Sequence, residues 1–422
     1  MHPMPPLFSA HGGVNLTIGC KMKYHLCFLF LFCVLASHAQ TITITGKIID
    51  KESKEGLPFA SIGIKGVSLG TISNLSGEFD FHIPVRHRND ILVISMLGYQ
   101  QFEAPVFSLQ KEQLVIEMEK SNFLLKEVVV ADTLRGGEIM EIALSKINQN
   151  YPSQPFMLEG FYRDLKKVAN TYISLLEAAL KVYDEDYEEP RNKLKLRERV
   201  SLIEVRRSLG YSSKFTSFFD NDNLLQDLLL ENMVRYRMFP EDESFFKSLM
   251  REKDSEYAGM DVFVVSHKEH YFLRVYIDKR TFGIVHIDYE DREQKVLGKK
   301  KGLVSKFEGL KRTIDFKWVD GKLYVNYILL NSRVSWYDEE TQKLKFETEL
   351  IRQFSVNKVT PNTAERINMR DRMKGYSLQY QDRAYNKAFW DNYNMIKESA
   401  LDKSIIKDLE REGSLESQFQ DN

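Results

Sequence analysis

Apolar and polar residues alternate through the first part of the chain. Within residues 41–45, Ile42 and Ile44 fall on one face of a predicted strand and threonines fall on the other. Turn-forming clusters rich in Gly, Asn and Asp separate this run from further strand-like runs. Short strands at this spacing predict a β-sandwich over residues 40–119. The further runs are residues 59–64, 77–83, 91–96, 101–106 and 114–118, and the turns are 50–56, 66–70 and 74–77.

The pattern becomes mixed in the middle of the chain. Residues 120–138 form a predicted linker, and residues 139–150 carry apolar side chains at helical spacing before Pro152. Residues 171–183 suit either a helix or strands, and the pattern leaves this open. The leucines of residues 223–233 predict a buried helix.

A period of two returns between residues 257 and 356. Asp320 and Gly321 form a dipeptide that strongly favours a hairpin, so neighbouring runs are expected to pair antiparallel. The result is a predicted β-meander of about six strands by this strand signal. The runs are residues 261–266, 271–278, 284–289, 312–318, 323–330 and 346–354.

The last part of the chain, residues 360–422, returns to a helical pattern. Phe389 and Trp390 are expected to dock onto the sheet, and the final ten residues are expected to fray. The predicted fold class is therefore α+β. The N-terminal sandwich is followed by an α+β domain over residues 139–422, which comprises the antiparallel meander, packed helices and a C-terminal helical tail.

The first forty residues have the pattern of a secretory leader. Lys21 and Lys23 precede an apolar run at residues 26–36, and a small-x-small cleavage sequence follows at residues 37–39. The run is too short to span a bilayer comfortably. We therefore expect residues 1–39 to be removed, leaving no transmembrane span in the mature chain.

Two details refine the leader. Met22 is the expected start, because the preceding residues show no periodicity, and cleavage leaves Gln40 as the first residue. Cys33 lies inside the apolar run and not after small residues at its end, so we do not expect lipid attachment there. The predicted location is outside the cytoplasm, in the periplasm or associated with the outer membrane.

The amino-acid composition excludes several classes of protein and of reactive site. The chain has 422 residues, 43% of them hydrophobic, and its 59 Lys plus Arg nearly balance its 60 Asp plus Glu. This balance is typical of a folded globular protein and argues against a nucleic-acid binder. The three cysteines, Cys20, Cys27 and Cys33, all lie in the leader. The mature chain is thus expected to have no thiol nucleophile, thiolate-bound metal or disulfide.

Two motifs invite a catalytic or metal-binding interpretation. Residues 66–70 match the G-x-S-x-G pattern around Ser68, but another turn follows where a nucleophile elbow needs a helix. His267, His270 and His286 lie in neighbouring predicted strands, yet the first two are three residues apart and point to opposite faces of a strand. We therefore predict no catalytic, cofactor-binding or metal-binding residues, and no cofactor.

Charge is concentrated in three stretches. Residues 184–189 are acidic and residues 191–207 are basic, and residues 193–199 as a strand would have one cationic face. Such a face suits an anionic ligand, or it is a solvated face paired with the adjacent acids. Residues 294–312 are interpreted as a basic hairpin loop that suits contact with anionic lipid.

Spaced motifs in the predicted sandwich resemble the carboxypeptidase regulatory-like domain. The resemblance implies a transthyretin-like sandwich of the kind found at the N-terminus of exported envelope proteins of Bacteroidota, including TonB-dependent receptors. It implies no peptidase, because none of the nine His has a Glu three residues later to form the zinc-binding pair. The motifs are Gly46-x-x-x-Asp50, Gly56-Leu57-Pro58-x-Ala60, Gly66-x-x-x-Gly70-Thr71-x-x-Asn74-x-x-Gly77-x-Phe79 and Leu92-x-x-Ser95-x-x-Gly98-Tyr99.

A shorter resemblance concerns the meander. The hairpin sequence at residues 276–285, in which a strand ends at Asp278 and restarts after Gly283, is similar to that of periplasmic lipoprotein-carrier half-barrels. That resemblance implies a lipid or acyl ligand, or an apolar peptide, held in a concave apolar pocket.

The sequence thus favours a non-catalytic binding or scaffolding protein of the cell envelope. The β-sandwich would dock an outer-membrane or periplasmic partner, and the meander would hold an apolar ligand. Two alternatives are an accessory component of a TonB-dependent uptake system and an envelope hydrolase that acts through Asp, Glu, Ser or His. A receptor itself is disfavoured, because the residues after Val130 are too few for its plug and barrel.

Overall fold

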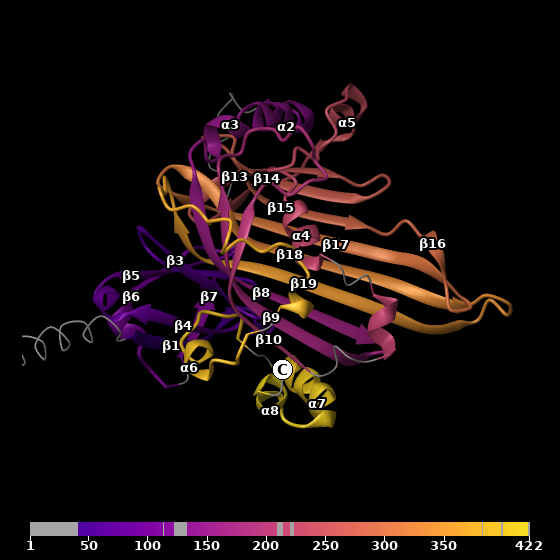
Figure 1. Ribbon diagram of the computed structural model, residues 1–422. Coiled ribbons are helices and arrows are strands. Elements are labelled where there is room, and N and C mark those ends of the chain that lie inside the picture. The colour runs from indigo at the N-terminus through magenta and orange to yellow at the C-terminus, as the bar shows by residue number, and fades with distance from the viewer. Residues whose placement is uncertain are drawn as a thin grey trace, which may run out of the picture.

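A computed structural model describes residues 41–112, 114–121, 133–208, 214–219, 223–381, 383–397 and 400–420. The predicted leader, with its start at Met22, its cysteines and the new terminus at Gln40, lies outside the described residues, as does most of the predicted linker. Figure 1 shows an N-terminal β-sandwich in indigo beside a long antiparallel sheet. Every helix in the described part of the chain is too short or too polar to cross a membrane.

The N-terminal domain is a sandwich of two sheets, as predicted. In the first sheet, β1 pairs antiparallel with β4 and parallel with β7. In the second, the strand order is β3-β2-β5-β6. Inward-facing residues such as Ile44, Phe79, Ile62 and Ile94 form one core between the sheets. The bounds are β1 Thr41–Asp50, β2 Ser61–Ile64, β3 Val67–Ile72, β4 Glu78–Pro84, β5 Ile91–Ser95, β6 Phe102–Pro105 and β7 Leu114–Met118.

One sandwich strand was not predicted. Residues 66–70 were expected to be a turn, but β3 begins at Val67 and pairs with β2. Two glycines in this segment concealed the strand, because glycine is depleted in strands. Gly70 is required by close packing, since a Cβ there would lie 2.7 Å from the carbonyl oxygen of Ile62.

The second part of the chain builds the antiparallel sheet. The order is β11-β13-β14-β15-β17-β18-β19, and β19 then pairs with β8, which leads to β9 and β10. The meander is confirmed, and residues 171–183 belong to a strand, not a helix. The bounds are β8 Phe156–Val168, β9 Thr171–Asp184, β10 Arg199–Arg207, β11 Met250–Arg251, β12 Ser255–Tyr257, β13 Met260–His267, β14 Phe272–Asp278, β15 Ile284–Asp291, β16 Lys295–Lys300, β17 Leu303–Val319, β18 Lys322–Asp338 and β19 Leu344–Thr360.

The alternation along β19 assigns the two faces of this sheet. Leu350 and Phe354 lie on the face covered by α4 (Leu224–Leu230), where a large apolar core has formed. Ile351, on the opposite face, packs against α7 (Ala400–Leu409) of the C-terminal tail. The face under α4 is called the inner face below, and the other is called the tail face.

Short helices close one end of the inner face. They are α2 (Gly136–Ser145), α3 (Ile147–Asn150) and α5 (Glu243–Ser248). The predicted helix over residues 139–150 therefore starts three residues earlier and breaks at Lys146. Gly137 lets α2 approach α5 closely, because a Cβ there would lie 2.3 Å from a carbonyl oxygen of α5.

The C-terminal tail is more ordered at its end, and less helical in its middle, than the sequence predicts. Residues 361–381 contain only the 3-10 turn η5 (Leu378–Tyr380), whereas α8 (Leu415–Gln420) buries Leu415 and Phe419. Trp390, at the end of α6 (Lys387–Trp390), docks onto the tail face as predicted and is 1% exposed.

Candidate functional site

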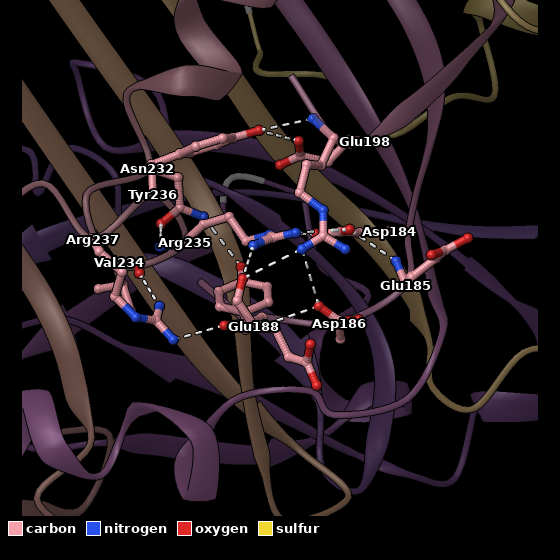
Figure 2. Close-up of polar contacts among 12 residues, drawn as sticks. Asp184, Glu185, Asp186, Glu188, Glu198, Asn232, Val234, Arg235, Tyr236 and Arg237 are labelled. Carbon is pink, nitrogen blue, oxygen red and sulfur yellow. Dashed lines mark hydrogen bonds and ion pairs between the residues drawn. The ribbon is translucent and has the colours of Figure 1, made fainter. Parts of the chain in front are cut away.

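The middle of the inner face is occupied by a buried network of charged and polar side chains (Figure 2). Arg235, fully buried, donates to both carboxylate oxygens of Asp184, at 2.6 and 3.1 Å. Tyr236 donates to Glu198, which is also buried. Asn232 accepts from the Arg235 amide and donates to Tyr187 at 3.1 Å. Residues far apart in sequence thus satisfy one another's hydrogen bonds.

Two buried carboxylates share one buried guanidinium in this network. Burial, together with repulsion from Asp184, raises the pKa of Glu198 to about 7, although Arg235 opposes the shift. The cavity beside these groups is only about 20 Å³. It holds about one water molecule. The network therefore fills this part of the inner face and leaves no room for a substrate there.

The structure settles how the charged stretches are arranged. Residues 193–198 are not a strand, so the predicted cationic face does not exist. The basic residues instead pair with the neighbouring acidic stretch, as the solvated alternative expected. The N···O distances are 3.1 Å for Lys193 to Glu189, 3.5 Å for Arg197 to Asp186 and 3.2 Å for Arg199 to Glu185.

Beyond α4, the inner face is hollow. A groove of about 610 Å³, called the distal groove below, lies between the far ends of β17, β18 and β19 and the 3-10 helix η4 (Lys214–Phe218). Its volume is within the range typical of ligand sites. Its apolar lining comprises Phe218, Phe219, Leu224, Leu297, Val334, Trp336 and Leu350.

The distal groove also has cationic groups. Arg352 is 8% exposed, its Nη1 lies 3.9 Å from Asp227, and its Nε is buried without a hydrogen-bond partner among the described residues. Lys299 and Lys300 line the groove, and the first pairs with Glu339 at 2.6 Å. The stretch 294–312 that carries these lysines forms the antiparallel hairpin of β16 and β17, so the predicted basic hairpin is present but consists of paired strands and not of a loop.

Neither of the two motifs considered for catalysis or metal binding has a reactive arrangement. Ser68 lies within β3 and donates to the carbonyl oxygen of Val359. His267 lies 2.9 Å from Ser248 Oγ and packs against Tyr271. The described part of the chain has no group of three or more His, Cys, Asp or Glu side chains that could hold a metal ion.

His286 has a partner that sequence analysis missed. It sits directly across from Asp315 on the neighbouring strand, with Nδ1 2.9 Å from the carboxylate. Burial disfavours the imidazolium, but hydrogen bonds to Asp288 and Asp315 raise the pKa of His286 to about 10. A histidine that stays protonated at neutral pH stabilises the sheet but is not available as a general base. The strand register, known only after the hairpins are assigned, was the missing signal.

The comparisons with known proteins identify the N-terminal domain. Residues 44–130 match the family model of the CarboxypepD_reg-like domain. Over 100 residues the chain is 32% identical to the TonB-dependent receptor SusC of Bacteroides thetaiotaomicron, a segment that is 24% of this chain and 9% of the receptor. The chain therefore contains a CarboxypepD_reg-like domain, and it spans less than a tenth of the length of the receptor it matches.

Solved structures resemble this chain only distantly. Lipovitellin aligns with 59% of this chain and 29% of its own, at 8% identity and a TM-score of 0.27. A LolA superfamily protein from Nitrosomonas europaea aligns with 55% of this chain and 96% of its own, at 10% identity and a TM-score of 0.19. MucB aligns with 54% of this chain and 98% of its own, at 10% identity and a TM-score of 0.19. None of these likenesses supports an inference about function.

Proposed function

We propose that this chain is an exported, non-catalytic binding protein of the cell envelope and that its meander domain holds a lipid or acyl ligand. The distal groove carries the proposal. Its apolar lining comes from three strands and the adjacent helices. The lining also includes the buried Arg352, whose Nε has no hydrogen-bond partner among the described residues. A ligand with an apolar chain and an acidic head group would satisfy both features.

The buried network supports binding over catalysis. Burial raises the pKa of both Asp184 and Glu198, but these carboxylates border a cavity of about 20 Å³ and not the groove. An envelope hydrolase would need two titratable groups converging in an open cleft. In the groove the ionisable residues are cations and Asp227, which suits retention of an anion more than proton transfer.

Palmitate binding tests the proposal. The delipidated protein should bind palmitate saturably, as followed by native mass spectrometry and fluorescence displacement. Leu297 and Val296 are adjacent exposed residues of β16, and only Leu297 lines the groove. Leu297→Glu should weaken binding at least tenfold, because it places a carboxylate beside the acyl chain, whereas Val296→Glu should leave it unchanged. Equal effects of both substitutions, or no saturable binding, would refute the proposal.

A second candidate function is association with a TonB-dependent uptake system through the N-terminal domain. The identity to SusC over 100 residues is the observation that favours it. Phe107 is 52% exposed on this domain, and Met369 is 91% exposed in the tail region. A photocrosslinker placed at Phe107 in cells should trap an outer-membrane receptor identified by mass spectrometry, and one at Met369 should not. Crosslinks to a receptor from neither position would remove this candidate.

A further inference from the structure

A second hollow lies where the two domains meet. It has a volume of about 700 Å³ and shares no lining residue with the distal groove. One wall is the β2–β3 hairpin of the sandwich, and the other is formed by Phe316, Lys317 and Trp318 near the end of β17. Figure 1 shows the indigo strands of the sandwich beside the orange strands of the long sheet. Ligand pockets occur preferentially at such domain boundaries.

The sandwich wall of the hollow includes outward-facing residues of β2 and β5, most of which are small. Ile62, Ile64 and Ile94 point into the sandwich core. The adjacent positions Ser61, Gly63, Val93 and Ser95 have the opposite orientation and line the hollow. Ser61, Gly63 and Ser95 have a short side chain or none, so the period-two pattern of β2 and β5 leaves space at these positions.

The opposite wall presents hydrogen-bond donors that have spare capacity. Lys317 Nζ donates to the carbonyl oxygen of Val356 at 3.0 Å, which uses one of its three N–H groups. The indole Nε1 of Trp318 is buried and has no acceptor among the described residues. Arg280 lines the mouth and is exposed.

The charges around the hollow favour an anion. Its described lining includes three cations, Lys65, Arg280 and Lys317, against one acid, Asp320. Lys65 is already paired with Glu103 at 2.8 Å. Burial lowers the pKa of Lys317 to about 8, and the charge of Asp315 only partly offsets this. A bound anion next to the ammonium would favour its charged form and so oppose the lowering of the pKa by burial.

We propose that this interdomain pocket binds a small organic carboxylate, with its carboxylate on Lys317 and Trp318 and its apolar body against Phe316 and Met260. Arg280 would close over the anion at the mouth. The pocket has one partly buried ammonium and one indole N–H and lacks an arginine cluster, which fits a carboxylate better than a phosphate. The proposal concerns a different site from the distal groove and does not depend on it.

A matched pair of probes tests this proposal. Benzoylglycine carries the carboxylate, and benzoylglycinamide has the same body without the charge. By isothermal titration calorimetry the full mature protein should bind the acid saturably and the amide at least tenfold more weakly. Bound benzoylglycine should also protect Lys317 from acetylation, as measured by peptide mass spectrometry.

Three variants assign the binding to this pocket. Lys317→Met should weaken benzoylglycine binding at least tenfold, and Lys299→Met, the same change in the distal groove, should leave it unchanged. Arg280→Gln changes an exposed residue and should weaken benzoylglycine binding about threefold. This variant tests the pocket if Lys317→Met fails to fold. Equal binding of acid and amide, tighter binding of phenyl phosphate, or full binding by both pocket variants would overturn the proposal.

Discussion

The inner face of the sheet has one half that is packed with side chains and one half that is open. Its middle is filled by α4 and by residues 231–239, which bring Arg235 into an ion pair with Asp184 and close enough to Glu198 to affect its charge. Its far end, where β17, β18 and β19 each run for 17 residues, extends past α4 and remains hollow. The same sheet therefore provides a closed core and an open groove, and the difference lies in what covers it.

The largest expected effect concerns the filled half. Arg235→Met would leave Asp184 and Glu198 buried together without their cation, which should cost about 3–5 kcal/mol of unfolding free energy. Arg197→Met removes a half-exposed partner of Asp186 and should cost at most about 1 kcal/mol. Urea denaturation measures both. A loss below about 1 kcal/mol for Arg235→Met would show that the network does not hold the inner face together.

Leucine truncations compare the two halves directly. Leu228 of α4 is 0% exposed in the filled half, so Leu228→Ala should cost about 2–5 kcal/mol. Leu297 is 53% exposed at the distal groove, so Leu297→Ala should change stability by at most about 0.5 kcal/mol. Thermal and urea unfolding measure the pair. Similar losses would contradict the view that the groove is open.

The pH dependence of stability sharpens the comparison further. The folded-state pKa of Glu198 is raised to about 7 from 4.5, so the folded state binds more protons than the unfolded state between these values. The contribution of Glu198 should therefore favour folding at pH 5 and decline as pH rises through 7. Urea midpoints at several pH values measure it, and Glu198→Gln should flatten this part of the profile. An unchanged slope in that variant would exclude Glu198 as the cause.

The smallest effect is expected at the rim of the distal groove. Lys299 and Glu339 form an ion pair with side chains 65% and 42% exposed. Lys299→Met should change the unfolding free energy by at most about 1 kcal/mol, and added salt should reduce the difference. Denaturation at low and high salt measures this. A larger loss would mean that the rim is part of the packed core.

Much of the fold was predictable because its cause is local. Period-two alternation located most strands of the sandwich and all six predicted runs of the meander, and the helical pattern of the tail predicted that Trp390 docks onto the sheet. The errors occurred where local signals conflict. Two glycines concealed β3, and the alternating charges of residues 193–199 imitated a strand.

The candidate sites were less predictable, because they depend on residues far apart in the chain. Arg235 and Asp184 are 51 positions apart, and His286 and Asp315 are 29 apart. Asn394 of the tail exchanges two hydrogen bonds with the His82 backbone, 312 positions away. No spacing in the sequence marks such pairs, since each depends on strand register and on the path of the connecting segments.

The sequence by itself determined the strand pattern, the CarboxypepD_reg-like motifs and the balance of charge, because these depend on neighbouring residues. Only the tertiary structure decided which charges are buried, which half of the inner face is filled and where the two hollows lie. The physical reason is that burial and cavities arise when distant segments pack. A sheet face has the same alternation whether a helix covers it or a ligand does.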